Sequence, residues 1–142
     1  AASITRLLDM GVESYLIAST VKGILAQRLV RRLDPQTRIA YEAPPEMIAE
    51  HGLQQFTEQR PILLYRPDTE APGGGYHGRS AITELLVMNE ELRSLLMRQA
   101  DAATLEQAAR RGGLRTLYED GLRQAIAGIT SLDEVLRVTR GD

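Results

Sequence analysis

All six prolines of this 142-residue chain lie between residues 34 and 78, and a run of three glycines occupies positions 73–75 of the same stretch. Proline removes a backbone donor and glycine permits positive φ, so both interrupt regular elements. The stretch is therefore expected to be loop-rich. Two short elements fit within it: a helix over residues 46–51, directly after a proline pair, and a strand over residues 62–65.

The residues after position 88 contain no proline and repeat apolar side chains at helical spacing. Asn89, Asp101 and Ser131 each stand where an N-cap is expected, and Glu134 follows Ser131 at the spacing of a capping box. Helices are thus predicted to start near residues 89, 101, 116 and 131. Short glycine-containing turns join them, which predicts a three- or four-helix bundle at the C-terminal end of the chain.

The start of the chain predicts two more short helices, within residues 1–20 and separated at Gly11. Residues 24–33 fit either a helix or a strand, because their leucines recur every four residues while Gly23 precedes them and an Asp-Pro pair follows. Residues 79–87 are a second strand candidate. The fold class expected from these patterns is α+β, mainly α.

Composition excludes several classes of protein. The chain has no cysteine, which excludes disulfides, thiolate metal sites and a cysteine nucleophile. Its 17 basic and 19 acidic residues give a net charge of −2, too balanced for a general binder of nucleic acids or membrane surfaces. No apolar run of about 18 residues predicts a membrane span, and the first residues lack the pattern of a signal peptide. Because the chain opens at Ala1 without an initiator Met, we expect an excised piece of a longer protein.

No catalytic motif is supported by its surroundings. The glycine-rich residues 73–78 match the letters of a dinucleotide fingerprint, but a proline-rich loop precedes them and a strand candidate follows. Lys22 is the only lysine and lies outside any Walker A sequence, while His51 and His77 are too isolated to predict a metal pair. We therefore predict no catalytic residue and no metal ligand. Arg28 fits either a contact to a phosphate or a neighbouring subunit, or a solvated arginine beside a strand.

Six strings of residues carry a resemblance to a known family. They are TRLLDMG (5–11), LAQRLVR (25–31), GYHGR (75–79), ELL (84–86), LYEDGL (117–122) and GITSLDEVLRVT (128–139). In these strings, and in their order, the chain resembles the C-terminal end of the secretion ATPases, hexameric P-loop enzymes that drive type II secretion and type IV pilus assembly. The resemblance covers essentially the whole chain, and the last two strings are more similar to the type II secretion member.

This resemblance implies a place within a larger ATPase. The implied divisions are the end of a RecA-like core (1–33), a metal-binding-type insertion (34–78), a returning core strand (79–88) and a C-terminal helical subdomain (89–142). It also implies that residues 24–33 form a strand and pair with the returning strand. The family's parts that bind ATP and Mg²⁺ precede this region, so the chain alone is expected to be inactive.

The insertion departs from the family in its cysteines. Many members carry a tetracysteine zinc site there, and the matching positions in this sequence are Asp34, Thr37, Asp68 and Ala71. Alanine cannot coordinate, and two Asp with a Thr make a poor zinc site. We therefore expect no zinc, and an insertion held by packing or hydrogen bonds.

The resemblance also suggests roles for two arginines. Arg79, in the GYHGR string, resembles an arginine near subunit contacts in the hexamer, where it could sense a neighbour's nucleotide. Arg28, in the LAQRLVR string, is a second candidate.

The function implied by the resemblance belongs to the intact protein. It would be a homohexameric ATPase in the bacterial cytoplasm, peripheral at the inner membrane, that contacts secretion platform proteins and powers pseudopilus assembly for protein export. This chain would contribute subunit packing and motion coupling. Two alternatives stay open: the same region of a type IV pilus assembly or retraction ATPase, and a stand-alone helical interaction module.

Overall fold

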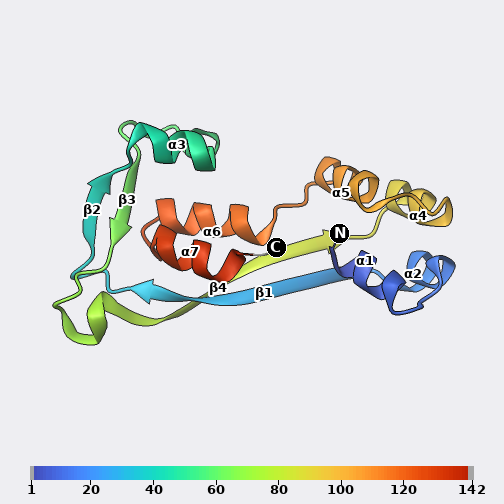
Figure 1. The fold of residues 1–142 in the computed structure, drawn as a ribbon, viewed down its shortest axis with the longest axis horizontal. Coiled ribbons are helices and arrows are strands. Elements are labelled where there is room, and N and C mark those ends of the chain that lie inside the picture. Colours follow the sequence, from blue (N-terminus) through green and yellow to red (C-terminus); the bar gives the residue numbers. More distant parts are fainter. Residues whose placement is uncertain (1, 141–142) are drawn as a thin grey trace. The chain divides into compact units, whose positions relative to one another are not determined.

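The computed structural model describes residues 2–140 and has an α+β fold with more residues in helices than in strands. The elements, in chain order, are α1 (Ala2–Asp9), α2 (Ser14–Thr20), β1 (Gly23–Leu33), β2 (Ile39–Glu42), α3 (Pro45–His51), η1 (Leu53–Gln55), β3 (Leu63–Arg66), η2 (Pro72–Gly75), β4 (Tyr76–Val87), α4 (Glu90–Met97), α5 (Ala102–Arg111), α6 (Leu117–Ile126) and α7 (Leu132–Thr139). β1 pairs with β4, and β2 pairs with β3 (Figure 1). Within the described part of the chain, no helix has the length and apolar character that crossing a membrane requires.

The chain folds as two compact units, each assembled from two separate stretches of sequence. Unit 1 consists of Ala1–Ala26 and Glu84–Thr116, and unit 2 of Gln27–Thr83 and Leu117–Asp142. The helices α4 and α5 thus belong to unit 1, and α6 and α7 to unit 2. The expected single helical bundle at the C-terminal end is therefore wrong: α4 packs on α2, whereas α6 and α7 share a core with the insertion.

The core of unit 1 forms between the apolar faces of four helices and the adjoining strand ends. Side chains with at most 1% exposure come from each helix: Ile4, Ile17, Leu92, Leu96, Leu105 and Ala108. Leu92 and Leu96 are four residues apart and so lie on one face of α4, which explains why both are buried. The two short helices expected at the start of the chain are confirmed as α1 and α2.

Side-chain caps confirm three of the predicted helix starts. Asn89 and Asp101 each accept a hydrogen bond from the backbone N–H three residues on, at 2.9 and 2.8 Å. Ser131 Oγ accepts one from the N–H of Glu134 at 3.2 Å. These bonds satisfy N–H groups that the first turn of a helix leaves without a partner.

In unit 2 the loop-rich insertion shares its core with α6 and α7. Leu53, Ile62 and Leu64 of the insertion are buried in one cluster with Leu122 of α6 and Val135 of α7. The strands β2 and β3 pair in antiparallel direction, and β3 contributes Leu64 to this cluster. The sequence predicted the helix and the strand that became α3 and β3, but not β2 (Ile39–Glu42), whose four residues include Ala40 and Glu42, both poor strand formers.

The two long strands form and pair as the resemblance implied. Residues 24–33, which fitted either a helix or a strand, form β1, and the partner strand β4 is confirmed. β4 begins at Tyr76, earlier than the expected residue 79, because Gly75, with φ of +86°, directs the chain into an extended strand.

Two turns of the same kind occupy the positions where the resemblance placed zinc ligands. In the first, Asp34 Oδ1 accepts from the N–H two residues on at 2.9 Å, and its carbonyl accepts from the N–H groups of Thr37 and Arg38 at 3.2 and 2.9 Å. In the second, Asp68 accepts the equivalent bonds at 3.1 and 3.0 Å, the latter from Ala71. Aspartate favours such turns because its side chain imitates a backbone acceptor.

Gly75 connects the two turns. Its carbonyl accepts a 2.9 Å hydrogen bond from the N–H of Asp34. A Cβ added to Gly75 would stand 2.6 Å from the backbone nitrogen of Asp68 and 2.7 Å from its carbonyl oxygen. The ends of the insertion are thus joined through backbone contacts that leave room only for glycine.

Candidate functional site

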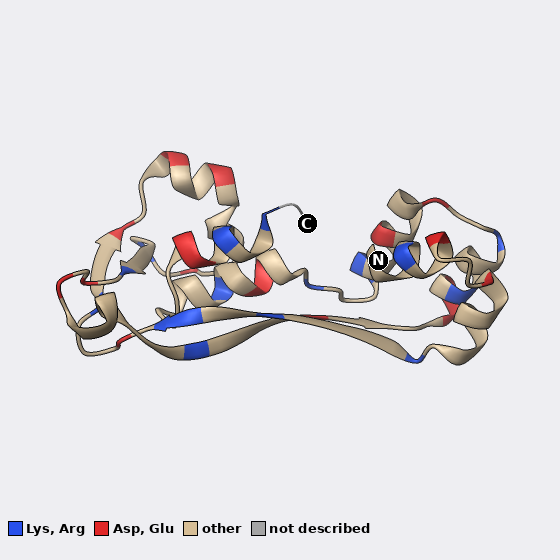
Figure 2. Cartoon of the chain, turned by 60° about the horizontal axis from the view of Figure 1, so that its bottom comes forward, with Lys and Arg blue, Asp and Glu red and all other residues tan. Residues whose placement is uncertain are grey.

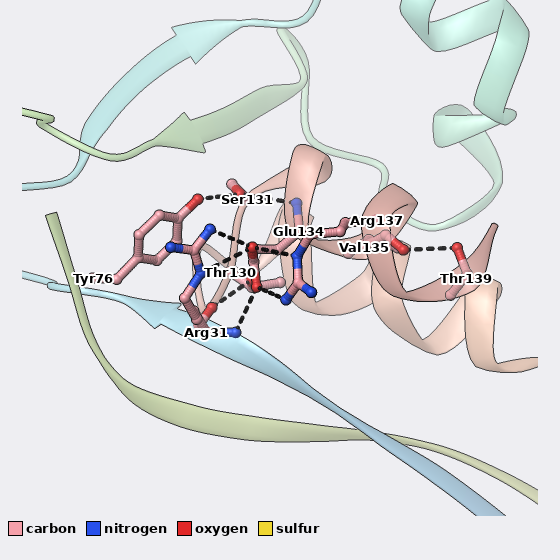
Figure 3. A network of polar contacts seen from close by, with 8 residues as sticks. All are labelled: Arg31, Tyr76, Thr130, Ser131, Glu134, Val135, Arg137 and Thr139. Atoms are coloured by element: carbon pink, nitrogen blue, oxygen red, sulfur yellow. Dashed lines mark hydrogen bonds and ion pairs between the residues drawn. The ribbon is translucent and has the colours of Figure 1, made fainter. Parts of the chain in front are cut away.

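Glu134, in the first turn of α7, is a carboxylate with only 2% of its surface exposed. It accepts hydrogen bonds from the N–H, Nε and Nη2 of Arg31 at 2.8, 3.0 and 2.7 Å. It also accepts from Nε and Nη2 of Arg137 at 3.1 and 2.9 Å. Figure 3 shows the carboxylate between the two guanidinium groups, which are themselves about half exposed. The buried negative charge is thus neutralised from two sides.

Tyr76, the first residue of β4, joins this arrangement. The guanidinium carbon of Arg31 lies 4.2 Å from the centre of the Tyr76 ring, a cation–π distance. The Tyr76 hydroxyl is 2.7 Å from Ser131 Oγ, the same atom that caps α7 (Figure 3). We call Arg31, Tyr76, Ser131, Glu134 and Arg137 the Glu134 network.

Hydrogen bonds to the backbone of β1 extend the contact between this strand and the segment before α7. Thr130 Oγ1 donates to the carbonyl of Arg31 at 2.8 Å, and the N–H of Leu33 donates to the carbonyl of Ile129 at 2.9 Å. Because Glu134 accepts the N–H of Arg31 as well, the end of β1 is bonded to the segment that leads into α7.

Helix α6 holds β4 further along. Gln124 accepts from Ser80 Oγ at 3.0 Å and donates to the carbonyl of Ala81 at 2.8 Å. Asp120 Oδ2 accepts from the N–H of Thr83 at 2.9 Å. β4 is therefore bonded to α6 and α7 from Tyr76 to Thr83.

The two arginines suggested by the resemblance lie on these strands. Figure 2 shows basic residues on the paired strands β1 and β4, where Arg28 and Arg79 stand. Arg79 is exposed, and its side chain makes no hydrogen bond or ion pair with the other residues that the structure describes. Arg28 is also exposed, but its Nη1 donates to the carbonyl of Val138 in α7. Neither belongs to the Glu134 network.

The histidines of the sequence are not brought together. His51 of α3 bonds through Nδ1 to the hydroxyl of Tyr118, and His77 is exposed on β4. Among residues 2–140, no group of three or more acidic or histidine side chains is placed to hold a metal ion.

The Glu134 network changes the acidity of its members. Burial alone would raise the pKa of Glu134, but the hydrogen bonds from Arg137 and Arg31 outweigh it and lower that pKa to about 2. The bonds to Glu134 in turn raise the pKa of Arg31 and of Arg137. All three groups are therefore charged at neutral pH.

The lowered pKa predicts a specific loss of stability in acid. A carboxyl group whose pKa falls on folding stabilises the folded state above its unfolded-state pKa, and this contribution is lost as the pH falls through the folded-state value. The difference in free energy of unfolding between wild type and Glu134→Gln is thus expected to be constant above about pH 5 and to vanish towards pH 2. Urea denaturation of both chains across this range measures it. A difference independent of pH would contradict the prediction.

Sequence reasoning missed the Glu134 network. The spacing of Ser131 and Glu134 predicted a capping box, of which only the serine half forms, because the carboxylate bonds Arg31 and Arg137 instead. Arg137, three residues after Glu134, was the one available signal, and such spacing ordinarily indicates an exposed pair on a helix.

Comparisons with known proteins give this geometry a family context. A family model described as "Type II/IV secretion system protein" matches residues 1–137. The chain is 54% identical over 98% of its length to the type II secretion system protein E of Xanthomonas campestris pv. campestris. It is 42% identical over 98% of its length to the type IV pilus assembly ATPase PilB of Thermus thermophilus, and 40% over 97% to the type II secretion system ATPase E of Vibrio cholerae.

The chain is much shorter than these relatives. It covers 25% of the Xanthomonas protein, 16% of the Thermus protein and 27% of the Vibrio protein.

Proposed function

Since this chain belongs to the family of type II/IV secretion system proteins, we propose that it is the C-terminal region of a hexameric ATPase that powers protein export by type II secretion. The observation that carries the proposal is the 54% identity, over 98% of the chain, to a type II secretion system protein E. The intact enzyme acts in the cytoplasm at the inner membrane, where it contacts the secretion platform and drives pseudopilus assembly. ATP and Mg²⁺ are bound by parts of the enzyme outside this chain.

A type IV pilus motor is the second candidate. It is supported by 42% identity over 98% of the chain to a pilus assembly ATPase. A replacement experiment separates the two candidates: this chain is substituted for the C-terminal region of a type II secretion ATPase and, separately, of a type IV pilus ATPase. Under our proposal, the chain restores secretion by the type II secretion ATPase. Restoration of piliation alone would favour the pilus motor.

Within the enzyme, this chain contributes subunit packing and couples motion, and alone it is expected to hydrolyse no ATP. We propose that the insertion keeps its shape without zinc, which is supported by the two aspartate turns that are joined through Gly75 and connect its ends. The apolar core that the insertion shares with α6 and α7 also supports an insertion held by packing.

Arg79 is the residue that we assign to sensing a neighbouring subunit's nucleotide. Its guanidinium is exposed and makes no hydrogen bond or ion pair with other described residues, so it is available to an incoming phosphate. Arg28 is a weaker candidate, because its guanidinium donates to the last turn of α7.

Replacing Arg79 by Ala in the intact enzyme tests the assignment. We expect kcat for ATP hydrolysis to fall about a hundredfold, as when one preorganised donor to a developing charge is removed. The KM for ATP should stay unchanged, because the triphosphate is held elsewhere. Arg66→Ala, at an exposed position on β3, is the matched control and should leave kcat as it is. Equal activity of both variants would remove Arg79 from the mechanism.

A further inference from the structure

Arg79 stands between two anchored points of β4. Three residues before it, Tyr76 is bonded to Ser131 and stacked under Arg31. Directly after it, Ser80 and Ala81 are both bonded to the side chain of Gln124. The backbone of β4 is thus fixed on both sides of an arginine whose own side chain is exposed.

The first anchor depends on Glu134. The carboxylate of Glu134 accepts hydrogen bonds from both Nε and Nη2 of Arg31, and these bonds hold the guanidinium over the Tyr76 ring. The backbone N–H of Glu134 donates to Ser131 Oγ, which is the hydrogen-bond partner of the Tyr76 hydroxyl. One buried residue of α7 therefore contacts both partners of Tyr76: Arg31 through its carboxylate and Ser131 through its backbone N–H.

We propose that Glu134 and Gln124 are positioning residues for Arg79, so that α7 and α6 set where this arginine meets the nucleotide of a neighbouring subunit. The inference rests on the sensing role proposed for Arg79 above. Displacing a charged group by about 1 Å at a reacting centre costs about a hundredfold in rate, so loss of one of two anchors is expected to cost about tenfold.

Double variants of the intact enzyme test the inference. We expect Glu134→Gln and Gln124→Leu each to lower kcat about tenfold, with KM for ATP unchanged. Combined with Arg79→Ala, neither should lower kcat below that of Arg79→Ala alone, because a positioning residue has no effect once its target is absent. Glu90→Gln, which breaks an exposed pair with Arg93 in unit 1, is the matched control and should leave kcat unchanged.

The outcomes separate the two proposals. Losses that multiply in the double variants would overturn the positioning role while leaving the sensing role of Arg79 intact. An Arg79→Ala enzyme with unchanged kcat would overturn the sensing role itself. Gln124→Leu keeps the test decisive where Glu134→Gln fails to fold, because Gln124 reaches β4 through different bonds.

Discussion

Glu134→Gln is expected to lower the free energy of unfolding of the chain by about 3 kcal/mol. The shift of the Glu134 pKa from 4.5 to about 2 measures how much the folded state prefers the charged carboxylate, and each pKa unit corresponds to about 1.4 kcal/mol. Glutamine keeps the shape but not the charge, so it loses this preference. Arg31 and Arg137 are about half exposed, so water can solvate them, which keeps the loss near the lower end for a broken buried pair. Chemical denaturation at pH 7 measures the loss.

Glu90→Gln is the matched control for this prediction. Glu90 pairs with Arg93 at 3.1 Å, but its side chain is 95% exposed. A surface pair of this kind contributes less than about 1 kcal/mol. Equal losses in the two variants would mean that burial of Glu134 does not strengthen its bonds.

Gly75→Ala is expected to cause the largest loss of stability, about 4 kcal/mol. A φ of +86° costs an alanine about 1–2 kcal/mol, and the added Cβ would meet the Asp68 nitrogen at 2.6 Å and its carbonyl oxygen at 2.7 Å. Backbone atoms of a bonded turn cannot move aside as the end of a flexible side chain does. Thermal or chemical unfolding of the two chains gives the difference.

Gly74→Ala separates the two causes of that loss. Gly74 has a φ of +68°, but beyond its two chain neighbours no atom lies within 4 Å of the place where its Cβ would stand. It should therefore lose only the conformational part, about 1 kcal/mol. If Gly74→Ala and Gly75→Ala lost the same amount, the contact of Gly75 with the Asp68 turn would not hold the insertion.

Local signals predicted the helix starts because the physics at those positions is local. Asn89, Asp101 and Ser131 cap helices through bonds that reach only three residues along the chain. The strand β1 was different: its leucines fitted two periods, and only the resemblance indicated a strand, since its pairing with β4 joins residues far apart in sequence.

The division into units could not be predicted for a similar reason. Each helix of the C-terminal stretch showed an apolar face, but the face does not say what covers it. Leu92 of α4 is buried with Ile17 of α2, whereas Leu122 of α6 is buried with Leu64 of the insertion. Both partners come from much earlier in the chain.

The Glu134 network could not be predicted from the sequence. The roles that the resemblance suggested for Arg79 and Arg28 stay predictions, and the residues that hold β4 around Arg79 carry no motif. Glu134 stood at the capping-box spacing from Ser131, which is a local signal. Its bonds to Arg31, however, join residues more than a hundred positions apart in sequence. A buried carboxylate paired with two arginines is therefore a feature that only the fold reveals.

The most direct test of our account is ATP hydrolysis by this chain compared with that by the intact enzyme, at equal molar concentration and with Mg²⁺. We propose that the chain is the part of a secretion ATPase that packs and positions subunits and holds no triphosphate of its own. The prediction is hydrolysis by the intact enzyme and none above buffer by the chain. Turnover by the chain in proportion to its concentration would contradict the account.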